Sequence, residues 1–448
     1  MNNDDHNNEL QHLKRLTAIR SGKNIKFLIP AVYAAGACPM RVACNICEDI
    51  EGLSYLIVGM PECAIHSRGT TSMPEGKSGE LRWLYTLDAN EVVFGSREGI
   101  VDALRVMDEA GARAILMVAT CVTDLIGEDF EGIIEEIQPE LNARLSFVTL
   151  GQFRNFGAGV GTWKTAEALA RFMAPKESKM ADSKKAYAKI ANALLVEPWH
   201  NKNSEVEYPL IVHALEDGGV KIRKLAAGAT LDDYMEAPQA AMNIVLTSYT
   251  QPLAAKMQAE FGVPYAPLHE AFAVEAIDRV YSNIAGVFGI DLCGRFNAWR
   301  EKALELEERA FRDLSGLKYV IMREVDMPIA LALYLARFGM EPILIHLSEP
   351  HTEDLGYAKS LKALGFDPPV CRMMHIDLDT ELILKLKPDI AFGYLRNPIA
   401  GFNCAEDMND FFGMTGYERT VALLTRIFNV LDTGNQGKKM DIYGATPF

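Results

Sequence analysis

The chain has 448 residues and a formal net charge of −15, because 45 Lys and Arg residues face 60 Asp and Glu residues. This length allows roughly two to four domains, and the negative charge argues against nucleic acid or an anionic membrane as the main partner. The 49% apolar and 23% charged fractions are typical of an ordinary globular protein, not of a disordered chain. Small molecules and other proteins therefore remain as partners.

The eight cysteines are too few for the disulfide framework of a small secreted protein. The first residues, MNNDDHNNELQHLKRL, lack the apolar core of a signal peptide. No run of about 18 apolar residues predicts a transmembrane helix. We therefore expect a cytoplasmic protein whose thiols are reduced and available to bind metal.

Three series of apolar runs alternate with helix-like segments along the chain. The first series is KFLIPAVYAA, LSYLIVGM, ARAILMVAT and LSFVTLG; the second is NALLVEP, VKIRKLAAG, MNIVLTS and VPYAPL; the third is KYVIMRE, EPILIHLSEP and KPDIAFGYL. Short apolar runs separated by about a dozen residues or more are typical of buried parallel strands with helical crossovers. The pattern predicts an α/β fold with three doubly wound, Rossmann-like parallel-sheet domains.

We expect these domains to span residues 1–173, 190–316 and 317–448. A Lys-rich segment with few large apolar residues separates the first two domains near residues 174–190, and a long helix that ends at Gly316 closes the second. The last helix, YERTVALLTRIFNVLD, has apolar residues at three- and four-residue intervals. This spacing predicts that it packs back against an earlier part of the chain.

Three cysteines fall in loops after apolar runs. Cys63 follows LSYLIVGM, Cys121 directly follows ARAILMVAT, and Cys38 lies in the turn AAGACPM. Ligands of open α/β sheets collect at the carboxyl ends of the strands, so three thiolates from separate loops can converge on one iron–sulfur cluster. Buried free cysteines also act as small apolar residues, and position alone favours neither interpretation. Their placement in loops, where functional residues concentrate, favours the cluster.

The other five cysteines are predicted to be structural. Cys44 and Cys47 form a CNIC pair, but no second such pair exists to complete a zinc site. A packing role is therefore favoured for both. Cys293, Cys371 and Cys404 are isolated, and Cys404 has the most polar surroundings of the three.

The common nucleotide-binding motifs are missing. Gly76-Lys77-Ser78 lacks the first glycine of a phosphate loop, because Thr71 stands in its place. The glycines of NFGAGVGTW do not fit the dinucleotide fingerprint and predict a tightly packed loop instead. His66 and His200 are candidate polar site residues, although surface positions are more typical of such histidines. No catalytic residue is identified.

The sequence around the three cysteines resembles the component 1 family of nitrogenase and nitrogenase-like reductases. In that family, an EDxxVFGG-like stretch links the second cysteine to a third in a TTCxxEIIGDD-like turn. Here residues 90–95 read NEVVFG, and Thr120-Cys121 is followed by IGED at residues 126–129. The cysteine intervals of 25 and 58 residues and the C-terminal segment FFGMTGYERTVALLTRIFNVLD are similar to those of the β-type subunit. The resemblance covers most of the chain at fold level and is specific over about residues 36–131.

The resemblance implies that Cys38, Cys63 and Cys121 supply three thiolates to an iron–sulfur cluster, either a P-cluster-like [8Fe–7S] cluster or a [4Fe–4S] cluster. An ordinary [4Fe–4S] cluster takes four cysteines, so a partner chain, an unusual ligand or sharing of a larger cluster must complete the site. The implied partners are an α-type subunit, in a heterotetramer of two α-type and two β-type chains, and an ATP-binding iron–sulfur reductase, the Fe protein. The cluster would relay electrons from this reductase to a cofactor in the α-type subunit.

The chain also departs from the family pattern. Where the catalytic α-type subunit has a cysteine after a strand of the second domain, this sequence offers Thr247 and Ser248, and no histidine follows His375. The serine that can join the P-cluster on the β-type side falls in the region of Ala158. These departures argue against a nitrogenase-type catalytic cofactor in this chain.

Three functions remain open. The β-type assembly scaffold generally lacks the third cysteine, whereas Cys121 is present. We therefore expect an ATP-dependent, nitrogenase-like reductase subunit that acts with its partner on dinitrogen or on another small substrate, such as a methylthio-alkane. A metallocofactor assembly scaffold and a tetrapyrrole reductase subunit of the protochlorophyllide type are the alternatives.

Overall fold

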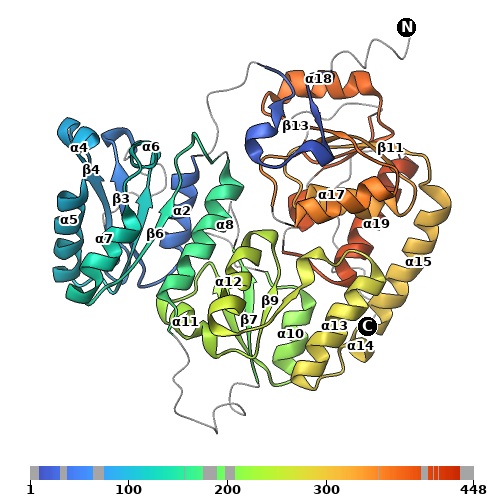
Figure 1. The fold of residues 1–448 in the computed structure, drawn as a ribbon. Coiled ribbons are helices and arrows are strands. Elements are labelled where there is room, and N and C mark those ends of the chain that lie inside the picture. The colour runs from blue at the N-terminus through green and yellow to red at the C-terminus, as the bar shows by residue number, and fades with distance from the viewer. Residues whose placement is uncertain are drawn as a thin grey trace. The chain divides into compact units, whose positions relative to one another are not determined.

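A computed structural model describes residues 10–30, 38–63, 75–155, 157–174, 189–196, 207–351, 353–394, 402–406, 408–411 and 413–433. The chain forms two compact units: residues 36–267 make one, and residues 1–35 with residues 268–448 make the other. Figure 1 shows their helices and strands. The predicted α/β class is confirmed, because the described residues form three sheets built around parallel strands and separated by helices.

The first sheet of residues 36–267 has the strand order β4-β3-β5-β6. Its strands are β3 (Ser54–Gly59), β4 (Arg82–Thr86), β5 (Ala114–Ala119) and β6 (Arg144–Thr149), and all their pairings are parallel. The connecting helices are α2 (Pro39–Glu48), α4 (Ala89–Phe94), α5 (Arg97–Glu109), α6 (Cys121–Ile126), α7 (Phe130–Ile137) and α8 (Ala158–Ala168). Strands β3 and β5 are buried along their whole length, which explains why their sequences are apolar apart from Ser54 at the start of β3.

The second sheet of this unit has the order β10-β9-β7-β8, also with parallel pairings only. Its strands are β7 (Ile190–Leu195), β8 (Lys221–Ala226), β9 (Met242–Val245) and β10 (Tyr265–Pro267). Its helices are α10 (Leu210–Asp217), α11 (Leu231–Glu236) and α12 (Gln251–Phe261).

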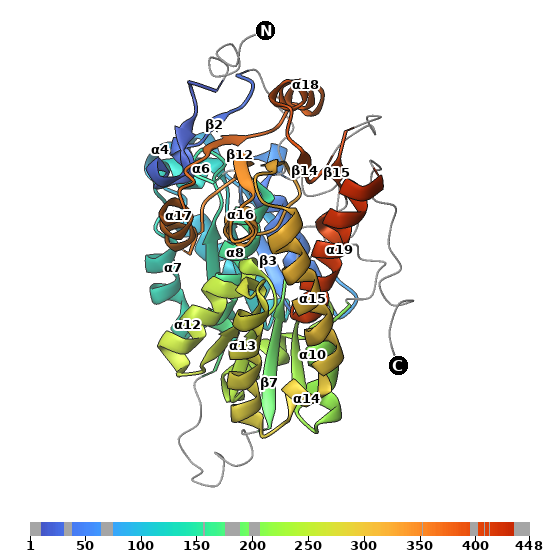
Figure 2. The ribbon, with the colours of Figure 1, turned by 90° about the vertical axis from the view of Figure 1, so that its right-hand side faces the viewer.

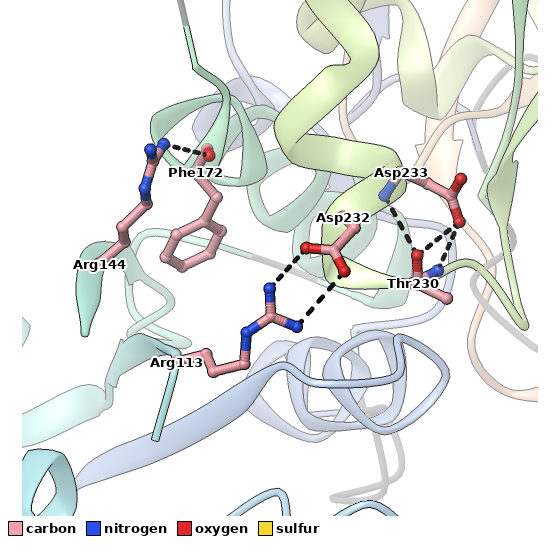
Figure 3. Close-up of polar contacts among 6 residues, drawn as sticks. All are labelled: Arg113, Arg144, Phe172, Thr230, Asp232 and Asp233. Carbon is pink, nitrogen blue, oxygen red and sulfur yellow. Dashed lines mark hydrogen bonds and ion pairs between the residues drawn. The ribbon is translucent and has the colours of Figure 1, made fainter. Parts of the chain in front are cut away.

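Backbone hydrogen bonds and a shared core join these two sheets. The backbone N–H of Glu51 donates to the carbonyl of Ala229 at 2.9 Å, and that of Leu231 donates back to Glu51 at 2.8 Å. Arg113 pairs with Asp232 on α11 at 2.5 Å, as Figure 3 shows. This ion pair is exposed and contributes little stability. The backbone bonds and the continuous apolar cluster below them therefore hold the two sheets together.

Two further contacts in Figure 3 fix the ends of elements near this junction. Thr230 forms a capping box at the start of α11, where its hydroxyl accepts from the N–H of Asp233 at 3.1 Å and its own N–H donates to the Asp233 carboxylate at 2.9 Å. Such a cap satisfies N–H groups that the first turn leaves without helical partners. The Arg144 guanidinium donates to the Phe172 carbonyl at 2.9 Å and so ties β6 to the end of the segment after α8.

Helices α2 and α8 lie side by side in the same unit (Figure 1). Gly161 makes this approach possible, because a Cβ atom built on it would lie 2.6 Å from the carbonyl oxygen of Pro39 and 3.0 Å from its Cα. The expectation of a loop at NFGAGVGTW was wrong in that α8 begins at Ala158. The glycines do serve tight packing, and they place α8 against the residue that follows Cys38.

The third sheet belongs to the other unit and has the order β1-β13-β12-β11-β14-β15, with β2 also beside β13. The strands are β1 (Lys14–Arg15), β2 (Lys26–Phe27), β11 (Lys318–Ile321), β12 (Glu341–His346), β13 (Pro369–Arg372), β14 (Ile390–Phe392) and β15 (Cys404–Ala405). Only β1 pairs antiparallel among them. The start of the run KFLIPAVYAA was expected in the first sheet, but β2 pairs with β13. The boundaries of the three predicted domains stay a prediction.

Helices surround this third sheet. They are α13 (Val274–Phe288), α14 (Leu292–Arg295), α15 (Asn297–Asp313), α16 (Pro328–Ala336), α17 (Asp354–Ala363), α18 (Ile376–Leu386) and α19 (Tyr417–Thr433). Figure 2 shows α19 beside α15, where Arg309 pairs with Asp432 at 3.1 Å and its guanidinium lies over the Phe428 ring. In the part of the chain that the structure describes, no helix is both long and apolar enough to cross a membrane.

The α2–α8 contact leads to a stability prediction. Gly161→Ala should lower the free energy of unfolding by about 1–3 kcal/mol, because its methyl group meets backbone atoms of Pro39 that cannot rotate away. Gly286→Ala on α13 is the matched control, since nothing lies within 4 Å of its Cβ position. This control should raise stability by about 0.5–1 kcal/mol through helix propensity. Chemical denaturation of the full chain measures both, and equal effects of the two substitutions would contradict the packing argument.

Candidate functional site

Two of the predicted site cysteines follow neighbouring strands of the first sheet. Cys121 is the first residue of α6, directly after β5, and Cys63 lies in a helical turn after β3. Strands β3 and β5 pair in parallel, with Val58 opposite Ala119, so their carboxyl ends lie next to each other. These two strand ends also flank the topological switch point of the sheet. The chain passes from β3 to β4 on one side, and β5 and β6 lie on the other side. This is where open α/β sheets bind ligands.

Thr120 fixes the spacing of these two strand ends. Both its hydroxyl and its backbone N–H donate to the carbonyl of Val58, at 2.9 and 3.2 Å. Gly59, which ends β3, leaves room for this arrangement: a Cβ atom there would lie 2.2 Å from the Thr120 hydroxyl oxygen and 3.1 Å from the Cys63 sulfur. Only glycine therefore fits at the end of β3 without displacing Thr120 or Cys63.

Cys38 enters the site from a third segment. It is the N-cap residue of α2, with Pro39 at the first helical position. Burial raises the pKa of the Cys38 thiol, nearby backbone N–H groups lower it, and electrostatic repulsion from Cys121 and Cys63 raises it. The three sulfurs are thus close enough to interact, although their positions in the sequence span more than 80 residues. The structure therefore brings the three predicted cysteines together.

Gln152 is a site residue that the sequence did not indicate. Its backbone N–H donates to the sulfur of Cys121 at 3.3 Å. It lies in the loop after β6, the strand next to β5. Only topology could have indicated this position in advance, because the loop after β6 lies at the same edge of the sheet as the cysteine loops. Any residue supplies a backbone N–H, so the type of residue at 152 gave no indication.

The donor set fits iron in a cluster better than a single metal ion. Within the described ranges, no three His, Cys, Asp or Glu residues are close enough to hold one ion. In an iron–sulfur cluster each thiolate binds a different iron atom, so the sulfurs can lie farther apart. Three thiolates are also soft ligands, which suit iron–sulfur clusters and not magnesium or calcium. By donor type, Cys38, Cys63 and Cys121 could each bind one iron atom of such a cluster.

Exposure separates these three cysteines from the other five. Cys38, Cys63 and Cys121 are half-buried, whereas four of the rest are fully buried and one is exposed. The buried four are Cys44, Cys47, Cys371 and Cys404, and the exposed one is Cys293. Cys44 and Cys47 belong to the apolar core under α2, and burial raises the pKa of both thiols. Both positions agree with a packing role.

The other candidates from the sequence are two histidines and an incomplete phosphate loop. His66 and His200 lie outside the described residues. In the Gly76-Lys77-Ser78 turn, the Glu80 carboxylate accepts from the N–H of Ser78 at 3.1 Å and fills the space beside Gly76. A carboxylate in this place would repel a phosphate group, which agrees with the incomplete phosphate loop.

The second sheet carries Thr247 and Ser248, and no cysteine, just after the segment of β9. Thr247 follows β9 and is fully buried. Its hydroxyl lies 3.4 Å from the carbonyl of Val196 and from the hydroxyl of Thr250. Its polar group thus has partners within the protein.

Exposed apolar side chains lie at the edge of the first sheet that carries the cysteines. On α4, Val93 is 71% exposed and Phe94 is 84% exposed. Leu125 on α6 and Phe153 after β6 are also exposed. Helices α4 and α6 are in contact, and all these residues follow strands that end at the same edge. An exposed apolar group of this kind is typical of a protein-binding surface.

Comparison with known proteins identifies the family of the chain. Residues 38–432 match the family of nitrogenase component 1 type oxidoreductases. The chain is 24% identical over 341 residues to the nitrogenase iron-molybdenum cofactor biosynthesis protein NifE of Clostridium pasteurianum, over 73% of this chain and 71% of that protein. It is 23% identical over 271 residues to a subunit of the light-independent protochlorophyllide reductase of Leptolyngbya boryana, over 56% of this chain and 52% of that protein.

Solved nitrogenase structures share the fold. Nitrogenase Cp1 at pH 6.5 superposes with a TM-score of 0.63 at 15% identity, over 90% of this chain and 94% of that one. The same protein at pH 5 gives a TM-score of 0.56 at 16% identity, over 99% of both chains. The family typically binds iron–sulfur clusters and forms multisubunit complexes with an Fe protein. Because the family match spans nearly the whole chain, the protein belongs to the nitrogenase component 1 type oxidoreductases.

Proposed function

We propose that this chain is the β-type subunit of a nitrogenase-like, ATP-dependent reductase, in which Cys38, Cys63 and Cys121 hold an interfacial iron–sulfur cluster. The observation that carries the proposal is the meeting of three half-buried thiols from three separate segments at one sheet edge. The complex reduces a small substrate, dinitrogen or another molecule such as a methylthio-alkane.

The bound cluster would supply one-electron storage between an electron donor and the catalytic partner. The residues of this chain would bind and position it. Burial favours the protonated thiol of Cys38. A thiol that binds metal is deprotonated, so iron would take the place of this proton. Thr120 and Gly59 set the separation of the two strand ends that carry Cys121 and Cys63. The half-buried position of the sulfurs reduces water access, which is one determinant of the reduction potential.

The incomplete ligand set supports a role at a subunit interface. Three cysteines are one fewer than a [4Fe–4S] cluster takes. An α-type partner would supply the missing ligands, whether the cluster is [4Fe–4S] or a larger [8Fe–7S] cluster shared between the chains. This arrangement requires contact between one α-type and one β-type chain, and in the proposed complex two such pairs form a heterotetramer.

Two features support a relay role for this chain instead of substrate binding. Thr247 offers a buried hydroxyl where a cofactor-binding thiol would be needed. The Gly76 turn holds a carboxylate instead of an ATP phosphate. The substrate cofactor would therefore lie in the α-type subunit, and ATP would be hydrolysed by the iron–sulfur reductase that docks on the complex.

A second candidate function is supported by the relatives. Two of them are named as iron-molybdenum cofactor biosynthesis proteins, so a scaffold for cofactor assembly shares the fold and partner type. The two functions differ in turnover. A complex that consumes a reducible substrate with its reductase and ATP is the proposed enzyme, whereas one that only transfers a cofactor to an apo-enzyme is a scaffold. A tetrapyrrole absorption band in the purified complex would instead favour a reductase like the Leptolyngbya relative.

The cluster assignment predicts a loss of iron. The double variant Cys63→Ala, Cys121→Ala should lose most of the iron from this subunit's site, because two of its three ligands are removed. Cys293→Ala is the matched control, since this thiol is exposed and lies in the other compact unit. Iron and sulfide counts on anaerobically co-purified complex measure the effect. Retention of wild-type iron by the double variant would disprove the assignment.

The exposed apolar surface predicts a docking defect. Phe94→Ala should weaken binding of the ATP-dependent reductase by about tenfold or more, because large exposed aromatic residues often dominate interface energies. Phe311→Ala on α15 serves as the control, since Phe311 is also an exposed phenylalanine, at 51%, but lies in the other unit. Titration of the complex with the reductase gives the affinities. Equal affinity for wild type and Phe94→Ala would show that docking occurs elsewhere.

A further inference from the structure

The peptide group between Gly151 and Gln152 connects the loop after β6 to Cys121. Its N–H, from Gln152, donates to the Cys121 sulfur at 3.3 Å. Its carbonyl oxygen, from Gly151, accepts from three donors: the backbone N–H of Arg154 at 3.1 Å, the backbone N–H of Asn155 at 3.0 Å and the side-chain amide of Asn155 at 2.9 Å. A trans peptide is planar with its N–H opposite its carbonyl. The bonds to the carbonyl therefore also direct the N–H toward the sulfur.

Asn155 is the side chain that fixes this orientation. It is only 3% exposed, and its amide nitrogen also lies 3.4 Å from the carbonyl of Thr149. Its amide oxygen accepts from the Lys164 ammonium on α8 at 2.6 Å. Because an ammonium only donates, the oxygen must face Lys164 and the NH₂ group must face the Gly151 carbonyl.

A second contact holds the same loop against α6. Asp124, one turn after Cys121, is buried and pairs with Arg154 at 3.2 Å. Gly151 packs directly on Asp124, since a Cβ atom at 151 would lie 2.4 Å from its carboxylate oxygen. These contacts fix the loop after β6 against α6, and they therefore also fix the Gln152 N–H relative to Cys121.

We propose that Asn155 is a positioning residue that sets the reduction potential of the cluster through the hydrogen bond from the Gln152 N–H to Cys121. This inference rests on the proposed function, because it requires Cys121 to be a cluster ligand. Hydrogen bonds to the sulfurs of a cluster are among the factors that set its potential. Adding an electron increases the negative charge on the ligand sulfurs, and an N–H donor stabilises that charge. Losing the fixed donor therefore lowers the potential.

The test compares Asn155→Asp and Asn155→Leu with wild type in the complex co-purified with its partner subunit. Both variants remove the NH₂ donor to the Gly151 carbonyl, and the aspartate keeps the size of the side chain. Asn142→Leu is the control, because Asn142 is exposed and precedes β6 at the opposite end of the strand. Iron counts establish that the cluster is present. A redox titration followed by electron paramagnetic resonance then gives the midpoint potential.

We expect the Asn155 variants to hold iron and to shift to a more negative midpoint. The reduced-to-oxidised ratio at a fixed potential should fall by up to about tenfold, which corresponds to about 59 mV for a one-electron couple. Asn142→Leu should match wild type. Unchanged midpoints in both Asn155 variants would overturn the proposal, and so would loss of iron from both, because Asn155 would then be needed for cluster binding and not for its potential. Absence of iron from the wild-type complex would instead disprove the proposed function itself.

Discussion

The candidate site depends on the parallel pairing of β3 with β5. This pairing places two strand ends side by side, and the chain then leaves them in different directions toward Cys63 and Cys121. The carbonyl of Val58 accepts two hydrogen bonds from Thr120, so the start of α6 is attached to the end of the neighbouring strand. The other parts of the site are arranged around this fixed pair. Helix α2 brings Cys38, and the loop after β6 brings a backbone N–H.

The buried cysteines contribute to the site indirectly. Cys44 and Cys47 lie roughly one and a half to two and a half turns after Cys38 on α2 and belong to the core between the helix and the sheet. Their burial fixes the rotation of α2, and Gly161 fixes its distance from α8. A helix held in this way presents its N-cap residue in a defined position. Residues with a packing role thus determine where the candidate ligand Cys38 lies.

The sequence predicted those parts of the fold and site that have a periodic or compositional signal. Strands β3 and β5 are apolar runs apart from Ser54 at the start of β3, and the turns after them carry Cys63 and Cys121. The two-residue strand β1 has no such signal. The apolar run that begins at Lys26 marked β2 but not its partner, because the pairing of β1 and β2 with β13 links positions more than 340 residues apart. Helix α8 was missed because glycine disfavours helices, although close packing requires Gly161. Gln152 donates through its backbone N–H, and nearly every residue type has this group, so its sequence identity could not reveal the contact.

The two sheets of residues 36–267 differ in the side chains at their carboxyl edges, and this difference favours the first sheet as the proposed site. At the first sheet, three sulfur atoms are half-buried and close enough to interact. At the second sheet, the corresponding strand end carries Thr247, whose hydroxyl is buried and bonded within the protein. A neutral hydroxyl is also a harder ligand than a thiolate and a poorer one for iron in a cluster. The second sheet therefore supports the first through the backbone bonds at Glu51 and the shared core, and the thiols of the proposed cluster site meet only at the first sheet, among the described residues of this unit.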